Sequence, residues 1–93
     1  MDFTFSAAMI EWRGPAPFYY VPIPKDICEE IKAAAKLISY GWGVIPVTAT
    51  IGKTTFTTSL FPKDGNYLLP LKNVVRLPEK LELGQTIKAK LVL

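Results

Sequence analysis

The strongest constraint on the fold is a pair of alternating segments separated by only two residues. Residues 44–51 alternate apolar side chains with threonines, which is the two-residue period of a half-buried β-strand. A second strand-like run, residues 54–61, follows after Gly52 and Lys53 alone. A two-residue loop that begins with glycine favours a type II′ turn, because φ is positive at its first central position. The sequence therefore predicts a tight β-hairpin with a defined register.

Four further segments have strand character. Two of them alternate apolar and polar residues, and the other two are rich in aromatic, β-branched or leucine side chains. Turn-forming stretches rich in proline and glycine lie between neighbouring segments. These four segments are residues 2–12, 18–22, 67–71 and 86–93. Together with the hairpin they predict about six strands.

One segment has the pattern of an amphipathic helix, from Lys25 to about Ser39. Apolar residues recur there at three- and four-residue intervals, and Asp26 with Glu29 has the spacing of a capping box. Gly41 would end this helix. Cys28 lies at the edge of the apolar stripe and is predicted to be a buried, inert thiol.

A shorter helical turn is expected over residues 72–77, stopped by Pro78. With it, the same order of elements occurs twice along the chain: a strand, a proline–lysine segment (Pro-Ile-Pro-Lys at 22–25, Pro-Leu-Lys at 70–72), a helix, a glycine and a strand. Two such halves related by a pseudo-twofold would interleave into a closed barrel without exposed sheet edges. We therefore predict a single domain over residues 1–93, mostly β with one main helix, folded as a small closed β-barrel of about six strands.

The composition excludes several kinds of chemistry. The chain has no histidine and one cysteine, which removes Ser-His-Asp and Cys-His catalysis and zinc sites built from these residues. Closely spaced carboxylates are limited to Glu29 and Glu30, which point in different directions on a helix. We expect no metal and no cofactor. A lone cysteine favours a reducing, cytoplasmic location, and no export signal or apolar stretch of about 20 residues indicates a membrane.

The remaining candidates for function are basic and hydroxyl side chains. Lys72 and Arg76 lie four residues apart on the expected short helix and are candidates for an anion clamp. The structural alternative is that Arg76 pairs with Glu79 or Glu82. A row of hydroxyl groups, Thr55, Thr57 and Ser59, faces one side of its strand. Catalysis by Ser59 would require a lysine or carboxylate base.

Nucleic-acid binding is the first alternative. The formal net charge is +3 and the sequence pI is about 9.1, without a dense basic cluster. Arg13, Lys25 and Lys53 are near aromatic residues in the sequence, and single-stranded nucleic acid stacks on such rings. The aromatic candidates are Trp12, Phe18, Tyr19, Tyr20, Tyr40 and Trp42.

The middle of the chain carries a specific resemblance. Residues 41–62, GWGVIPVTATIGKTTFTTSLFP, are similar to the signature of DUF1905, an uncharacterised bacterial and archaeal family of domains of unknown function. Flanking positions agree, among them Trp12, Pro70, Lys72 and Arg76. The resemblance implies a double-split β-barrel, which is also the architecture of swapped-hairpin transcription regulators, with both halves in one chain. It implies little about activity. Lys53 departs from the family pattern, which often has a small residue there.

Taken together, these features favour a non-enzymatic binding module for a protein partner or a small anionic ligand. The predicted ligand site is the barrel mouth, lined by Arg76, Lys72, Trp42, Ser59 and Thr57. Two alternatives stay open: a DNA-binding, regulator-like barrel that uses Arg13, Lys25 and Lys53, and an accessory or catalytic domain that works through Arg and Lys electrostatics.

Overall fold

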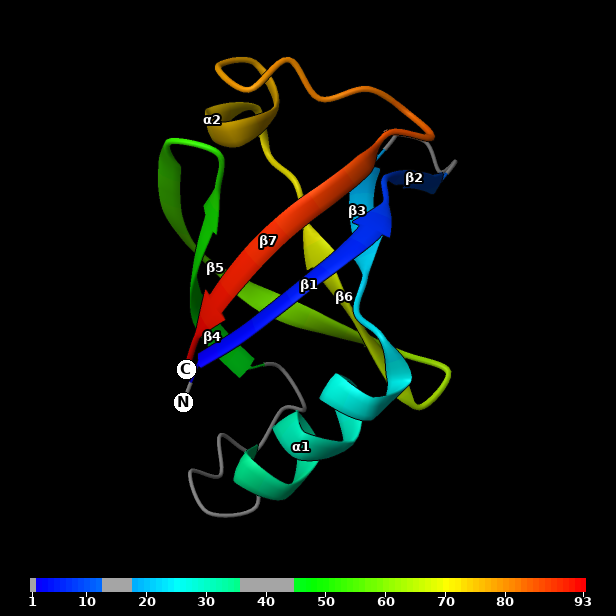
Figure 1. The fold of residues 1–93 in the computed structure, drawn as a ribbon. Coiled ribbons are helices and arrows are strands. Elements are labelled where there is room, and N and C mark those ends of the chain that lie inside the picture. Colours follow the sequence, from blue (N-terminus) through cyan, green and yellow to red (C-terminus); the bar gives the residue numbers. More distant parts are fainter. Residues whose placement is uncertain (1, 13–17, 36–44) are drawn as a thin grey trace.

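The structure is a computed structural model that describes residues 2–12, 18–35 and 45–93 (Figure 1). Within these residues the chain forms seven strands and two helices. In chain order they are β1 (Asp2–Ala8), β2 (Ile10–Trp12), β3 (Phe18–Pro22), α1 (Lys25–Ala35), β4 (Ile45–Ile51), β5 (Thr54–Lys63), β6 (Asn66–Pro70), α2 (Asn73–Arg76) and β7 (Thr86–Val92). The prediction of a mostly β chain with one main helix is confirmed.

All described strands belong to one antiparallel sheet with the order β1-β7-β4-β5-β6-β3-β2. The predicted hairpin is β4–β5, in which Ile51 pairs with Thr54 across the two-residue loop. Gly52 has a φ of 59°, which is the left-handed conformation that the first position of the predicted turn requires. The predicted two-residue hairpin with glycine at its first loop position is therefore confirmed.

The closed six-stranded barrel is wrong. The predicted single strand over residues 2–12 is interrupted at Met9, so that β1 pairs with β7 whereas β2 pairs with β3 at the other end of the sheet. Met9 instead exchanges backbone hydrogen bonds with the loop before β7, donating to Gln85 and accepting from Gly84, both at 3.1 Å. No ladder joins β1 to β2 or β3. The result is an open, strongly curled sheet of seven strands.

The two strand–helix–strand segments, β3-α1-β4 and β6-α2-β7, have neighbouring places in this sheet. β3 pairs with β6 and β4 pairs with β7, each in antiparallel orientation. The two helices lie at opposite ends of the curled sheet, with α1 below and α2 above in the view of Figure 1. The β4–β5 turn is at the same end as α2.

The concave face of the sheet holds the core. The strands contribute every second residue to it, as the alternation predicts, and α1 and α2 contribute Ile31 and Val75. The largest fully buried side chains of this core are Val21, Cys28, Ile31, Leu60, Leu69, Val75 and Leu91. The prediction that Cys28 is buried is confirmed: its thiol donates to the carbonyl of Ile23 at 3.3 Å and accepts from the amide of Tyr67 at 3.4 Å.

Helix α1 begins at Lys25, two residues earlier than a capping box with Asp26 as the N-cap implies. Asp26 therefore lies inside the first turn and does not cap the helix, and the amide of Cys28 bonds to the carbonyl of Pro24 at 2.9 Å. The predicted end near Ser39 and the glycine cap at Gly41 lie outside the described residues.

Candidate anion-binding site

The candidate site forms where the chain leaves β6 and enters α2. The pairing of β6 with β3 extends to Leu71, whose amide bonds to the carbonyl of Tyr19 at 2.8 Å. Lys72 is extended, with φ −87° and ψ 168°, and accepts the first backbone bonds of α2 through its carbonyl. This turn places Arg76 back over β3, with the guanidinium carbon 4.1 Å from the centre of the Tyr19 ring.

Arg76 has no carboxylate partner among the described residues. One of its terminal nitrogens, Nη2, donates to Oδ1 of Asn73, whereas Nε is buried without a hydrogen-bond acceptor. Glu79 is engaged elsewhere, because its Oε2 accepts from the hydroxyl of Thr54 at 2.7 Å and from the amide of Lys53 at 3.4 Å. The pairing of Arg76 with Glu79 or Glu82 that the sequence left open is therefore not formed.

A hollow of about 340 Å³ opens beside Arg76. Its volume is within the usual range for small-ligand pockets, about 300–1,000 Å³. Aromatic rings and two cationic side chains line it. The lining residues are Phe18, Tyr19, Tyr20, Pro70, Leu71, Lys72, Asn73 and Arg76, none of which is acidic. We refer to this hollow as the Arg76 pocket.

A second hollow, of about 450 Å³, adjoins the first through Pro70 and Lys72. The outward hydroxyls of Thr57 and Ser59 line it, together with Pro46 and Thr58. The register explains this neighbourhood: Phe61 pairs with Leu68, so Ser59 falls beside the end of β6. Lys72 thus lines both hollows, one with Arg76 and the other with hydroxyl groups that can donate and accept hydrogen bonds.

Four of the five residues predicted as the ligand site therefore lie on one continuous surface. Arg76 and Lys72 line the first hollow, and Lys72, Thr57 and Ser59 line the second. The fifth, Trp42, lies outside the described residues. The site is at the α2 end of a curled sheet and not in the mouth of a closed barrel.

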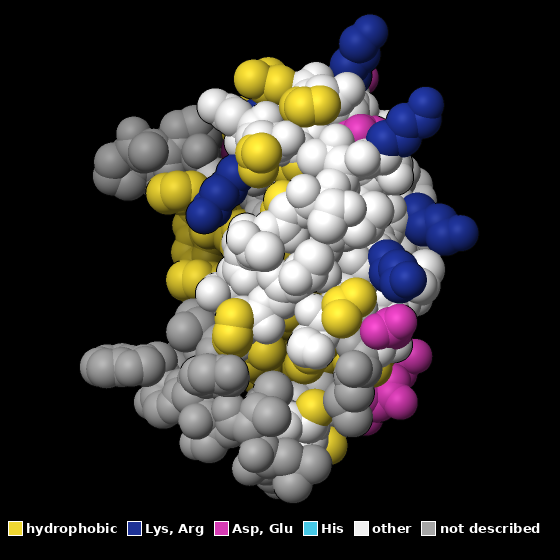
Figure 2. Space-filling view, turned by 90° about the vertical axis from the view of Figure 1, so that its left-hand side faces the viewer, with side chains coloured by type: hydrophobic (Ala, Val, Ile, Leu, Met, Phe, Trp, Pro, Cys, Tyr) yellow, Lys and Arg dark blue, Asp and Glu magenta, His cyan; other side chains and the backbone are white. Residues whose placement is uncertain are grey.

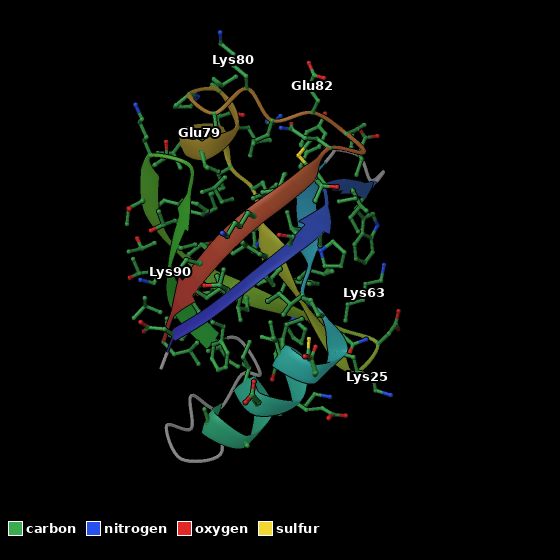
Figure 3. All side chains as sticks on the ribbon, in the orientation of Figure 1. Lys25, Lys63, Glu79, Lys80, Glu82 and Lys90 are labelled. Carbon is green, nitrogen blue, oxygen red and sulfur yellow. The ribbon has the colours of Figure 1, made fainter. Side chains whose placement is uncertain are left out.

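An aromatic cluster continues this surface along the outward face of β2, β3 and β5. The ring centres are 6.4 Å apart for Phe18 and Tyr20, 6.1 Å for Tyr20 and Phe61, and 6.5 Å for Phe61 and Trp12. The ammonium of Lys63 lies 3.5 Å from the centre of the Trp12 ring. Figure 3 shows Lys63 on the side of the molecule opposite Lys90.

Sequence reasoning missed Phe61 and Lys63, although a signal for them was present. Both have the same parity along β5 as Thr57 and Ser59, so a strand that continues past Phe61 must present all four on one face. Pro62 appeared to end the strand, yet β5 continues to Lys63, and Pro62 pairs with Tyr67.

The outward face of the sheet has two parts. We call the outward side chains of β2, β3, β6 and the end of β5 the aromatic half, with Ile10, Trp12, Phe18, Tyr20, Phe61, Lys63 and Leu68 as its members. We call the outward side chains of β1, β7, β4 and the start of β5 the polar half, with Thr4, Ser6, Thr48, Thr50, Thr55, Lys88 and Lys90 as its members. Figure 2 views the β4–β5 side, where charged side chains of both signs lie along one edge and hydrophobic side chains, with a basic one among them, gather along the other.

The basic residues of the nucleic-acid alternative do not share one patch. Lys25 begins α1 at one end of the molecule, and Lys53 lies in the β4–β5 turn at the other end (Figure 1). Arg13 lies outside the described residues. Any nucleic-acid surface on the described part of the chain would therefore need other cations.

Two searches of the described residues concern other site classes. No group of three or more His, Cys, Asp or Glu side chains gathers there in a way that could hold a metal ion. Neither described helix is long and apolar enough to cross a membrane.

Comparison with known families agrees with the resemblance noted in the sequence. The family described as Domain of unknown function (DUF1905) matches residues 5–91. The match spans nearly the whole chain, from β1 to β7, and the chain belongs to this family. No curated protein matches the chain.

Proposed function

We propose that this domain binds a small anionic ligand in the Arg76 pocket. The observation that carries the proposal is the state of Arg76: a partly buried guanidinium that has no carboxylate partner among the described residues and lines an open hollow. Burying a charged group without compensation is costly, and such groups are normally paired. An anion in the pocket would supply the missing opposite charge.

The surroundings suit an oxyanion. The Asn73 amide and the Tyr19 ring hold the guanidinium in place, so that little side-chain freedom remains to be lost on binding. A guanidinium offers a planar fork of donors that fits phosphate or carboxylate oxygens. Lys72 adds a second charge from the rim, and the hydroxyls of Thr57 and Ser59 stand beyond it.

Titration calorimetry with inorganic phosphate, pyrophosphate and a dicarboxylate tests this function. We expect the tightest of these anions to bind Arg76→Met about 10- to 100-fold more weakly than the natural chain, because a charge-assisted hydrogen bond is lost. Lys72→Gln should weaken binding several-fold.

Lys90→Gln is the matched control, since Lys90 is an exposed lysine of the polar half with only a 4.0 Å ion pair to Asp2. Its affinity should be unchanged. Equal affinity of Arg76→Met and the natural chain, together with a lower melting temperature of the variant, would show that Arg76 serves the structure alone.

A further inference from the structure

The Arg76 pocket and the aromatic cluster are one surface. Phe18 and Tyr20 line the pocket, and the same two rings begin the row that continues to Phe61 and Trp12. A ligand that fills the pocket and is longer than a simple anion would therefore lie across aromatic rings.

These rings are exposed in a way that packing does not explain. Phe18 is 57% exposed, Phe61 42% and Trp12 40%, and none of the three belongs to the core cluster. Contiguous exposed apolar surface on a small protein marks an interaction site. Aromatic rings that present their faces are also the platforms on which unpaired bases stack.

The charges around the rings select the kind of partner. Lys63 borders the cluster at Trp12, and Lys72 with Arg76 border it at Phe18. No member of the aromatic half and no residue lining the Arg76 pocket is acidic. A second copy of this chain would bring like charges together across the interface, whereas a polyanion would neutralise them.

We propose that the aromatic half binds single-stranded nucleic acid, with bases stacked on Phe18 and Phe61 and phosphates held by Arg76, Lys72 and the Lys63 ammonium that lies over Trp12. This inference rests on the proposed function, because it names the anion of the Arg76 pocket as a phosphate of the strand. Stacking accepts any base, so we expect little sequence preference. A duplex keeps its bases stacked on one another and offers the rings no free faces.

The direct test compares two fluorescently labelled strands by anisotropy at low salt: an eight-residue oligothymidylate and an abasic strand with the same number of phosphates. We expect the oligothymidylate to bind at least tenfold more tightly, because alanine scans assign about 1–3 kcal/mol to each stacked base. Three phosphate contacts predict a slope of log K against log salt of about −2.

Variants separate stacking from anion binding. Phe61→Leu should weaken oligothymidylate binding about 5- to 100-fold and leave binding of the abasic strand and of inorganic phosphate unchanged, because Phe61 does not line the Arg76 pocket. Phe18→Ala should weaken oligothymidylate binding by a similar factor. Arg76→Met should weaken all three. Leu83→Ala is the matched control, because Leu83 is also an exposed apolar residue, 53% exposed, and lies outside the aromatic half.

Each outcome has a distinct meaning. Equal affinity for the oligothymidylate and the abasic strand would overturn the stacking proposal and leave anion binding in place. Tighter binding of duplex DNA, or of an acidic peptide of equal charge, would also overturn it. No binding of phosphate or of either strand would remove both the proposed function and this inference.

Discussion

The polar half and the aromatic half of the outward sheet face follow the same alternation and have different contents. In the polar half the outward positions are mostly threonine, serine and lysine, as in an antiparallel sheet with one wet face. Its side chains also bond to one another, for example Thr50 to Thr55 at 3.0 Å. In the aromatic half three large outward rings, Phe18, Phe61 and Trp12, are at least 40% exposed, whereas Tyr20 is buried among them.

The difference teaches that the two halves carry different roles. Polar outward residues such as those of the polar half interact with water. Because only the opposite face is apolar, they also help to define the register of the strands. Exposed rings add little to stability and favour association, so their presence on one half only is the basis on which we propose that this half binds a ligand. Substitutions at positions that this division separates should therefore have different effects.

The first comparison asks whether the rings of the aromatic half hold the fold together. Leu69 is fully buried under this half on the inner face of β6, whereas Phe18 stands outside. We expect Leu69→Ala to lower the free energy of unfolding by about 2–5 kcal/mol, through lost burial and a cavity. Phe18→Ala should lower it by less than about 1 kcal/mol, as is usual for surface substitutions. Urea denaturation measures both, and comparable losses would make Phe18 a structural residue.

The second comparison concerns the β4–β5 turn, next to the polar half. A Cβ at Gly52 would lie 1.9 Å from Oε1 of Glu79, and the φ of 59° is unfavourable for alanine. We expect Gly52→Ala to cost about 2–4 kcal/mol, combining backbone strain with the disturbed Glu79 contacts. Gly84→Ala is the control: its φ is 79°, and nothing lies within 4 Å of the added atom.

Gly84→Ala should therefore cost only the strain of a left-handed residue, about 1–2 kcal/mol. Thermal unfolding of both variants checks the order. An equal loss in the two would mean that Glu79 moves aside freely and does not hold the turn.

The third comparison concerns the contribution of Arg76 to the free energy of unfolding. Arg76→Met removes a buried unsatisfied Nε, which is favourable, and a cation–π contact with Tyr19 worth about 0.5–1 kcal/mol, which is unfavourable. The two effects oppose one another, so the free energy of unfolding should change by less than about 1 kcal/mol. Chemical denaturation checks this, and a loss above about 2 kcal/mol would assign Arg76 to the scaffold.

The last comparison depends on pH and lies in the core. Burial raises the pKa of the Tyr67 phenol above its ordinary value of 10.0, and Cys28 adds to the increase. A raised pKa in the folded state means that the folded chain disfavours the phenolate, so stability is complete below pH 10 and falls as the pH rises above it. Tyr67→Phe should remove this part of the alkaline loss, at most about 1.4 kcal/mol per pH unit.

Melting temperatures between pH 8 and pH 11 measure the effect. The curve of the natural chain should fall more steeply above pH 10 than that of Tyr67→Phe. Parallel curves would show that Tyr67 ionises as easily in the folded chain as in the unfolded one.

The local elements of this fold were predictable, and the closure of the sheet was not. The alternation placed the inward residues of β1, β4 and β7 correctly, and Gly52 identified the tight turn. The break at Met9 had no signal, because Phe5, Ala7 and Met9 continue one apolar pattern through it. A strand that changes partners keeps its side-chain period, so periodicity reports which face is buried and not which strand lies beside it.

The candidate site was predictable for a related reason. A spacing of four residues places Lys72 and Arg76 on one side of a short helix, and a spacing of two places Thr57 and Ser59 on one face of a strand. Both relations are local and can be read from the sequence. The contact between Tyr19 and Arg76, in contrast, depends on the pairing of β3 with β6. These two strands lie far apart in the sequence. The aromatic cluster likewise depends on how three strands lie side by side. The sequence therefore identified several of its rings as candidates but could not predict that they lie together.

The most direct test of the central claim is a map of backbone amide chemical shifts during titration with oligothymidylate. The account predicts that shifts gather at residues 18–20, 61–63 and 71–76 and at the indole of Trp12, with residues 48–50 and 88–90 unchanged. Shifts that gather on the polar half, or that spread evenly over both halves, would contradict it.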